Sequence, residues 1–481
     1  MDAWVKKIAT HRGSPRVFLD GVQAVRTGFA PGEEFVVEVE GQRITLLKKD
    51  DGSRVLKPSG NRVRTVSSRE KNGRITPVID INSAELLKVF EGMEAIRVVV
   101  TKGAVHFLPL ASEIKRVERL DRLRKKLHEG ERLLTGSVSH GGGVLTHAIH
   151  QGLMDAGIDS TLALANEIRE DLLVQAIEHN GVWDDRTMAL ALPMQELVQD
   201  DWLMSKLPTL EVLELGVPCS GASKAGKAKK GLDMMEAHEH VGHLVAPALA
   251  IINRTQPVMV IMENVPDYFL SASAYILRHM LRDMGYDTHE AVLSGKDFGC
   301  LEDRVRHCMV ACTRGMAFDF RDIQPVLRVV QKVDDIVDKS IQPDDPRWRT
   351  FDYLQTKRDR DVAKGSNFKP QLIDVSSSHI TTLRKGYNKG GSTDPRLPHP
   401  IDPELSRLLT PEEHARAKGA PVELIADMSA TQAHELLGQA IVYEPFRAVG
   451  ERVGECILAF SAGVEAEDIE EVAVMRPRVC G

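Results

Sequence analysis

The chain has 481 residues, of which 42% are hydrophobic and 27% charged, a composition typical of globular proteins rather than of disordered or membrane proteins. This length predicts roughly two to four domains, with cores large enough to need no disulfide bonds. The net charge of -7 excludes a uniformly basic protein that coats nucleic acid. Any site for a polyanion must therefore be local.

The sequence shows no targeting signal and no spacing typical of a metal site. The longest apolar run, Leu244 to Ile252, is too short to span a bilayer, and Met1 to Lys7 contains no apolar signal segment. The six cysteines include no Cys-x-x-Cys pair, so we expect reduced thiols, no metal and a cytoplasmic protein. Three histidines lie within residues 238–243, but Gly242 stands where a His-Glu-x-x-His site needs its second histidine, so a solvated helix face is expected there.

Residues 1–110 predict a β-rich module that contains a duplicated unit. Alternating strands are expected at Phe35 to Leu47 and at Ile96 to Leu108, 61 to 62 residues apart, each after a strand and a short amphipathic stretch. The polar residues 50–72 predict a linker or long loop between the copies. Charge-rich helical spacing over residues 111–131 predicts a connecting helix.

Beyond residue 131, short apolar segments alternate with helical stretches, which predicts a doubly wound α/β domain with a mostly parallel sheet. The expected strands are Leu162 to Ala165, Leu210 to Leu215, Val258 to Met262 and Met309 to Ala311, and the expected helices include Leu172 to His179, Met234 to Asn253 and Ala274 to Met284. The domain is expected over residues 132–313 and, with further helices, over 401–462. Residues 314–400 predict an inserted, irregular smaller domain, and residues 463–481 a solvated acidic tail.

Ligands of such folds bind beyond the carboxyl ends of the strands, and two of these loops contain residues suited to a cofactor or a nucleophile. The turn Gly141, Gly142 and Gly143 allows close approach of a ligand, and Glu167 after the next strand suits a ribose diol, although such a turn is about as often only a turn. Pro218 and Cys219 follow the strand at Leu210 to Leu215, and a loop cysteine is either a nucleophile or, more often, a packing residue. Residues 221–228 match the P-loop spacing except at Ala228, which lacks the hydroxyl for Mg²⁺.

Two further loops contain charged groups. Glu263 directly follows the strand at Val258 to Met262 and can serve as a proton donor, or equally as a helix-capping acid. Arg304 and Arg306 stand two positions apart before the strand at Met309 to Ala311, so they point to the same side of an extended segment; surface salt bridges are the alternative.

Taken in chain order, these motifs resemble those of the DNA cytosine-5 methyltransferases. The resemblance rests on the glycine turn, Asn166-Glu167, Gly216-x-Pro-Cys219, Glu263-Asn-Val265, Arg304-x-Arg306, Arg407-Leu-Leu-Thr-Pro-Glu-Glu-His-Ala-Arg416 and Leu437-Gly-Gln-Ala-Ile441, and it covers about residues 132–460. It implies a Rossmann-like methyltransferase domain that uses S-adenosyl-L-methionine. Its specificity lies in the order of the motifs, because no single one would suffice.

The resemblance implies a mechanism and a set of site residues. Cys219 would add to C6 of a flipped cytosine, Glu263 would assist at N3, and Arg306, supported by Arg304, would hold O2. The implied cofactor-binding residues are Gly141, Gly142, Gly143, Glu167, Pro218, Gly438 and Gln439. The sequence departs from the family pattern at His140, Met194, Glu302 and Gln439, where glycine, aspartate, glutamine and asparagine are usual.

The insertion at residues 314–400 corresponds to the family's target-recognition domain. Residues 347–396 contain 11 Lys and Arg against 5 Asp and Glu, a local excess that suits double-stranded DNA. The residues expected to contact DNA are Lys224, Lys227, Arg384, Lys385, Tyr387 and Lys389. For residues 385–391, a surface turn without DNA contact is the alternative.

The N-terminal module lies outside the methyltransferase pattern. Its stretch Gly28 to Phe35 resembles AbrB-like and SymE-like β modules, which implies DNA binding or a homodimer through this module. Two functions remain beside a DNA methyltransferase of a restriction-modification system. One is a DNA-binding regulator with a degenerate methyltransferase domain, and the other is an RNA cytosine-5 methyltransferase with the same catalytic motifs.

Overall fold

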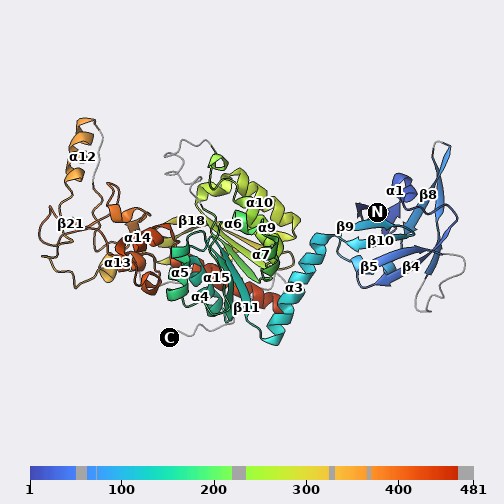
Figure 1. The fold of residues 1–481 in the computed structure, drawn as a ribbon, viewed down its shortest axis with the longest axis horizontal. Coiled ribbons are helices and arrows are strands. Elements are labelled where there is room, and N and C mark those ends of the chain that lie inside the picture. Colours follow the sequence, from blue (N-terminus) through green and yellow to red (C-terminus); the bar gives the residue numbers. More distant parts are fainter. Residues whose placement is uncertain (50–61, 72, 219–233, 324–330, 366–369, 464–481) are drawn as a thin grey trace. The chain divides into compact units, whose positions relative to one another are not determined.

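A computed structural model describes residues 1–49, 62–71, 73–218, 234–323, 331–365 and 370–463 (Figure 1). The chain forms two compact units, Met1–Val117 and Glu118–Gly481. Of the acidic tail expected at 463–481, only Gly463 lies within the described residues.

The N-terminal unit contains one order of elements twice. The first copy consists of β1 (Asp2–Lys7), β2 (Ala9–His11), β3 (Ser14–Leu19), α1 (Gly21–Arg26), β4 (Glu34–Glu40) and β5 (Arg43–Lys48). The second consists of β6 (Arg62–Thr65), β7 (Ser67–Lys71), β8 (Arg74–Ile81), α2 (Ala84–Leu87), η1 (Lys88–Phe90), β9 (Ala95–Thr101) and β10 (Ala104–Pro109). Its sheets have the orders β1-β9-β10-β5-β4-β6 and β2-β3-β8-β7, and exchanging the copies merely reverses each order. The unit therefore has an internal two-fold pseudosymmetry.

The register of the strand pairs has the same symmetry. Thr45 of β5 lies opposite its own counterpart in β10, His106. Between β3 and β8, Val17 lies opposite Ile81 and Leu19 opposite Ile79, so that each pair is the image of the other. A single copy would leave these strand edges unpaired, and the second copy covers them within one chain.

The linker expected at residues 50–72 is wrong in its second half, because residues 62–65 and 67–71 are strands. The first pairs with β4 and the second forms a hairpin with β8. Both are polar edge strands, so they lack the apolar alternation by which a strand is predicted. The first part of the expected linker, 50–61, lies outside the described residues.

Helix α3 (Ala111–Glu129) is built into the second unit through its basic residues. Arg119 is fully buried, donates hydrogen bonds to Thr313 Oγ1 (3.0 Å), Gln256 Oε1 and the carbonyl of Met284 (both 2.9 Å), and lies 4.1 Å from the centre of the Tyr286 ring. Arg122 and Lys126 pair with the fully buried Glu211 at 3.0 and 2.8 Å. The predicted connecting helix is therefore present, and its charged residues anchor it.

The second unit is built on a seven-stranded sheet with helices on both faces (Figure 1). The strands are β11 (Leu133–Val138), β12 (Ser160–Asn166), β13 (Met188–Leu190), β14 (Val212–Leu215), β15 (Met259–Asn264), β16 (Tyr286–Ser294) and β18 (Val305–Thr313). Their order is β13-β12-β11-β14-β15-β18-β16, and β18 alone runs antiparallel to its neighbours. The prediction of a doubly wound, mostly parallel α/β sheet is confirmed.

Successive residues of the central strands enter two different cores. Met259 and Ile261 of β15 face the core formed with α4 (Val144–Asp155) and α15 (Tyr443–Ser461). Val260 and Met262 face the core formed with α9 (Val245–Thr255) and α10 (Ala272–Asp283). Because both faces are covered, the strands are apolar without alternation, which is why the sequence reveals them.

The helix expected at Met234 to Asn253 is wrong in its first half, since α9 begins only at Val245. Residues 235–237 form a short 3-10 turn, and Gly242 lies so close to Glu236 that an added Cβ would be 2.2 Å from its carbonyl oxygen. His238 is buried and His240 exposed, so the expected solvated helix face is also wrong.

The segment between β18 and the last helices contains short elements held by buried arginines. Arg396 is fully buried, bonds to the carbonyls of Gly390 and Gly391 (2.7 and 2.9 Å), and lies 4.4 Å above the Phe351 ring. The elements are α11 (Val333–Ile336), α12 (Asp352–Ala363), β19 (Ile380–Thr381), η6 (Tyr387–Lys389), β20 (Leu397–Pro398) and β21 (Ser406–Arg407). Some of the basic residues that predict DNA contact therefore stabilise this segment internally.

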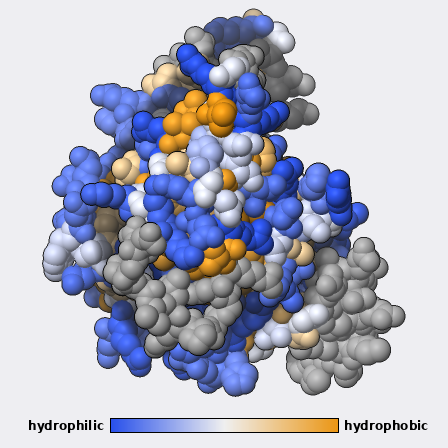
Figure 2. All heavy atoms as spheres, turned by 90° about the vertical axis from the view of Figure 1, so that its right-hand side faces the viewer, coloured by the Kyte–Doolittle hydropathy of each residue, from blue (hydrophilic) through white to orange (hydrophobic). Residues whose placement is uncertain are grey.

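The face in Figure 2 is largely hydrophilic, and its apolar atoms gather in small separate patches. None of the helices in the described part of the chain is long and apolar enough to cross a membrane.

Candidate active site

One edge of the large sheet, where β11, β12, β14 and β15 end and β18 begins, carries the glycine turn, Glu167, Pro218, Glu263, Arg304 and Arg306. Between β11 and α4 the chain turns sharply, with left-handed backbone at Ser139 (φ 58°), Gly141 (φ 58°) and Gly143 (φ 75°). An added Cβ at Gly143 would lie 2.4 Å from the Asn180 amide nitrogen. Glycine is therefore required there by both conformation and space.

His140, which stands where the family usually has glycine, points into the protein. Its Nδ1 lies 2.9 Å from Ser137 Oγ and 3.0 Å from Thr146 Oγ1, and Thr146 also donates to Glu214. Burial lowers the pKa of His140 to about 3 and raises the pKa of Glu214 to about 7. The imidazole is thus neutral and forms part of the support beneath the glycine turn.

The other predicted cofactor-binding residues adjoin this turn. Glu167, just after β12, accepts hydrogen bonds from the backbone N–H groups of Gly141 (2.8 Å) and Arg169 (3.0 Å). Gly142 packs against Leu436 of α14 (Ala430–Gln439), where an added Cβ would come within 2.3 Å of the side chain. The same helix ends at the predicted Gly438 and Gln439. The structure therefore brings both ends of the predicted cofactor site together, and the small residues of the turn fit a cofactor that approaches the backbone closely.

Cys219, Lys224, Lys227 and the P-loop-like residues 221–228 lie outside the described residues. The chain leading to them is fixed by Asn264, whose Nδ2 donates to the carbonyl of Val217 (2.9 Å). Gly216 donates its backbone N–H to the carbonyl of Val138 (3.0 Å). The sequence did not single out this role of Asn264 in holding the chain at Val217, although its place directly after Glu263 was an available signal.

Glu263 and Arg306 form an ion pair at this edge. The antiparallel pairing of β15 with β18 places Glu263 opposite Cys308, which is two positions after Arg306 in β18. The Arg306 side chain reaches back to Glu263, so that its Nε lies 2.7 Å from Glu263 Oε1. Both side chains are largely buried, with 14 to 16% exposed, so the pair is partly shielded from water. Arg304 instead donates to the carbonyl of Gly438 (3.1 Å), so the two arginines have different partners.

The described cysteines give a contrast with the expected nucleophile. Cys300, Cys308, Cys312 and Cys456 are buried. Burial raises the pKa of Cys312 and of Cys456 to about 12, and that of Cys308 well above its usual value. These three thiols are therefore protonated and poor nucleophiles.

The segment expected to contact DNA packs on α14. Lys385 pairs with Glu435 (3.0 Å) and bonds to Gln439 Oε1 (3.3 Å), and Arg384 pairs with the buried Asp394 (2.6 Å). Lys389 is exposed. The prediction that Tyr387 contacts DNA is wrong, because its side chain is buried.

Tyr387 is fully buried. Its hydroxyl donates to the carbonyl of Pro395 (2.8 Å) and accepts from the backbone N–H of Leu409 (3.0 Å). The ring fills the core of the smaller segment, where it lies against His414 and His434. An isolated aromatic residue in a basic stretch cannot be assigned to core or surface from sequence, since its neighbours come from other elements.

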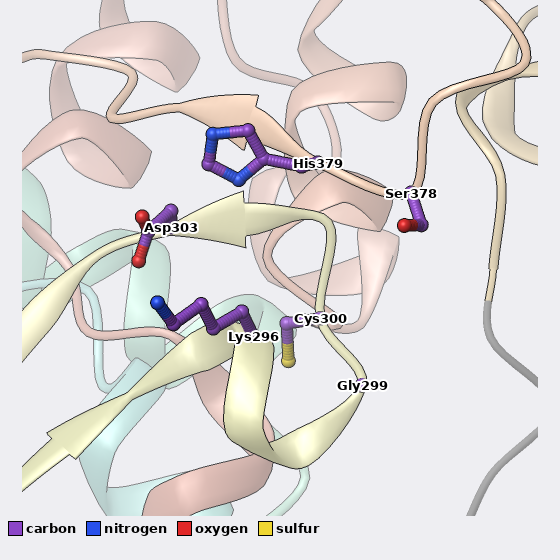
Figure 3. Close-up of a pocket in the computed structure, with 6 residues that line it drawn as sticks. All are labelled: Lys296, Gly299, Cys300, Asp303, Ser378 and His379. Carbon is purple, nitrogen blue, oxygen red and sulfur yellow. The ribbon is translucent and has the colours of Figure 1, made fainter.

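A pocket of about 560 Å³, whose lining includes Lys296, Asp303, Ser378 and His379, lies where the smaller segment meets the body of this unit (Figure 3). Lys296, Cys300 and Asp303 come from the chain around β17 (Glu302–Asp303), and His379 comes from the residues before β19. Strands β17 and β19 pair, so the pocket marks the junction of the two parts.

A seven-stranded sheet with one antiparallel strand, a glycine turn after β11, an acid after β12 and a Glu–Arg pair at the same edge define an S-adenosylmethionine-dependent methyltransferase. A sequence model of the family described as C-5 cytosine-specific DNA methylase matches residues 149–455, more than half of the chain. The chain belongs to this family, and the family's methyl donor is S-adenosyl-L-methionine.

Individual relatives agree with this assignment. The chain is 26% identical to the type II methyltransferase M1.ScrFI of Lactococcus lactis subsp. cremoris over 263 residues, 52% of this chain and 64% of that protein. It is 26% identical to M.NlaX of Neisseria lactamica over 273 residues, 55% of this chain and 82% of the relative. The chain thus spans less than two thirds of the length of M1.ScrFI.

Solved structures support the fold. The S. pombe Dnmt2 methyltransferase superposes with a TM-score of 0.52 at 18% identity and covers 68% of this chain and 99% of its own. The Entamoeba histolytica methyltransferase EhMeth also has a TM-score of 0.52, at 14% identity, over 67% of this chain and 98% of its own. The family match begins at residue 149, so the likeness of the N-terminal unit to AbrB-like and SymE-like modules stays a prediction.

Proposed function

We propose that this protein transfers a methyl group from S-adenosyl-L-methionine to C5 of cytosine in double-stranded DNA, as part of a restriction-modification system. The observation that carries the proposal is the Glu263–Arg306 pair (2.7 Å), held beside the chain that leads to Cys219. Cytosine C5 is a weak nucleophile, so a site for its methylation needs a nucleophile for C6 and polar groups for the ring. Family membership supplies the reaction class.

In the proposed mechanism, the Cys219 thiolate adds to C6 of a cytosine that has left the base stack. Glu263, in its protonated form, donates to N3 as negative charge develops on the ring, and Arg306 both orients Glu263 and donates to O2. Arg304 acts behind them by holding Gly438. Once C5 has formed its bond to the methyl group that the cofactor would supply, a base removes the C5 proton and Cys219 leaves C6 as the thiolate, which restores the aromatic ring.

The residues proposed to hold the cofactor are Gly141, Gly142, Gly143, Glu167, Pro218, Gly438 and Gln439. S-adenosyl-L-methionine, when bound, supplies the electrophilic methyl group. Gln439 is exposed at the end of α14 and Glu167 lies at the turn, so polar groups are available on both sides. His140 leaves the cofactor side open because its ring lies beneath the turn.

We assign DNA contact to Arg384, Lys385 and Lys389 in a recognition domain at residues 314–400, and to Lys224 and Lys227. The assignment rests on the local basic excess and on the packing of this segment against α14. For the N-terminal unit we propose DNA binding rather than a homodimer, because its two copies already pair their central edges within one chain. The proposal includes the cytoplasmic location predicted from the sequence, since the enzyme must reach DNA.

The test is expression of the full chain in a host without cytosine-5 methylation, followed by mass spectrometry of nucleosides from its DNA and, separately, its RNA. The proposal predicts 5-methylcytosine in DNA, and none above background with Cys219→Ser. Methylation of RNA alone would favour the RNA enzyme. A folded protein that binds DNA and the cofactor yet methylates neither nucleic acid would favour the degenerate regulator.

A further inference from the structure

A buried cluster of charges lies directly behind the arginine pair. Glu302 and Lys418 are fully buried and Arg304 is 5% exposed. Lys418 Nζ lies 2.7 Å from Glu302 Oε2, and Arg304 Nη1 lies 3.6 Å from Glu302 Oε1. Among the described residues, neither Lys418 Nζ nor Glu302 Oε2 has another hydrogen-bond partner, so each depends on the other.

Buried charges of this kind are costly unless each is matched. Removing a carboxylate and an ammonium from water lowers the stability of the fold, and a neutral pair of similar size is often equally stable. The resemblance predicts glutamine at position 302, which could accept the same hydrogen bonds without charge. In this chain the negative charge of Glu302 is balanced by Lys418, which follows the recognition segment in the sequence, whereas Glu302 precedes it.

The cluster connects three parts of the site. Glu302 Oε1 accepts the backbone N–H of Leu383 (3.1 Å), the residue before the proposed DNA-contacting segment. Arg304 donates to the carbonyl of Gly438 in the proposed cofactor site (3.1 Å). An added Cβ on Gly438 would lie 2.4 Å from the backbone of Arg384, so these parts are in direct contact.

The balance of charge determines where Arg304 lies. If Lys418 lost its charge, the unmatched carboxylate of Glu302 would attract the Arg304 guanidinium from 3.6 Å into a close pair, away from Gly438. If Glu302 lost its charge, Lys418 and Arg304 would face each other as buried like charges. Either change would move the backbone that leads into Arg306.

We propose that Glu302 and Lys418 are positioning residues for methyl transfer: their ion pair sets Arg304, and through it Arg306, Gly438 and the start of the recognition segment. The proposal rests on the proposed function, since it concerns the placing of groups for that reaction. It also explains why a charged residue is tolerated at position 302.

The test compares Glu302→Gln, Lys418→Gln and the double variant in the full-length protein. Steady-state methyl transfer to host DNA gives kcat and KM, and calorimetry gives the melting temperature. Each single change is expected to lower kcat by about tenfold to a hundredfold, because small displacements of reacting groups have effects of this size. The double variant removes one charge of each sign, so the cluster keeps the net charge of the parent, and it is expected to recover kcat to within about threefold of the parent.

The matched control is Lys126→Gln, the same type of substitution at another buried ion pair. It breaks the 2.8 Å pair between Lys126 of α3 and Glu211. It should lower the melting temperature but leave kcat unchanged at a temperature where the protein is folded. If the single variants fail to fold, kcat of the double variant decides alone. Singles with normal kcat, or a double variant as impaired as the worse single, would overturn the inference; an inactive parent protein would instead count against the proposed function.

Discussion

Glu214 should make the stability of the second unit depend on pH. The carboxyl lies at the end of β14 beneath the cofactor turn, is 4% exposed and accepts a hydrogen bond from Thr146. Burial raises its pKa from 4.5 to about 7. The folded state therefore binds a proton that the unfolded chain releases between these values, and folding is stabilised fully below pH 4.5 and progressively less as pH rises to 7.

The size of the effect follows from the pKa difference. About 2.5 pKa units at 1.36 kcal/mol each give roughly 3 kcal/mol between the two limits. The pKa of the buried His140 is lowered to about 3, so this residue favours the folded state more as pH rises, opposite to Glu214. The pH dependence of the stability of the parent protein is therefore the sum of both contributions. Comparison with Glu214→Gln, which is neutral at every pH, isolates the contribution of Glu214.

The assay is calorimetric melting of the parent and the Glu214→Gln variant at pH 5 and pH 8. At pH 5 the two should melt at similar temperatures, because both side chains are neutral when folded. At pH 8 the variant should melt several degrees higher, since only the parent then buries a charge. An equal difference between the two proteins at both pH values would refute the reasoning.

Three further predictions concern the site and the recognition segment. Glu263→Gln and Arg306→Lys should each lower kcat by roughly 10² to 10³ with DNA binding in a gel-shift assay retained, and an equal loss of binding would contradict their assignment to the reaction. Gly438→Ala should lower the melting temperature and raise KM for DNA, because the added Cβ would lie 2.4 Å from backbone atoms; no change in either would show that the chain relaxes freely. Lys389→Ala should reduce the slope of log affinity against log salt by about one, whereas Tyr387→Phe should leave that slope unchanged and lower the free energy of unfolding by about 1 to 2 kcal/mol. The reverse pattern would restore Tyr387 as a DNA contact.

The parts of the fold that the sequence predicts are those whose local pattern matches their environment. The strands β14, β15 and β18 are covered on both faces and hence mainly apolar, so the sequence reveals them. The sequence does not reveal the edge strand β16 or the polar strands β6 and β7. They form because they make hydrogen bonds to strands that are distant in the sequence. The helix expected at Met234 to Asn253 is broken by the packing of Gly242 on Glu236, which no local propensity reveals.

The candidate site likewise contains residues that a local motif predicts and residues that only the packing of distant segments brings into place. Glu263, Arg304 and Arg306 could be predicted because each lies at a strand end within a short motif. Lys418 could not, since its partner Glu302 is more than a hundred residues away and the contact depends on how α13 (Pro411–Ala417) packs. The burial of Tyr387 depends on such packing as well.

The pseudosymmetry of the N-terminal unit has a consequence for how it can change in evolution. At the centre of the β3–β8 pairing, Phe18 lies opposite its own counterpart, Asp80. Asp80 also forms a bidentate salt bridge with Arg16 (both contacts 2.8 Å). The residue that corresponds to Arg16 in the second copy is Val78. Two identical chains would have to place the same residue on both sides of this axis. Fusion of the copies frees each side to mutate independently, and it makes assembly of the unit an intramolecular event that does not weaken on dilution.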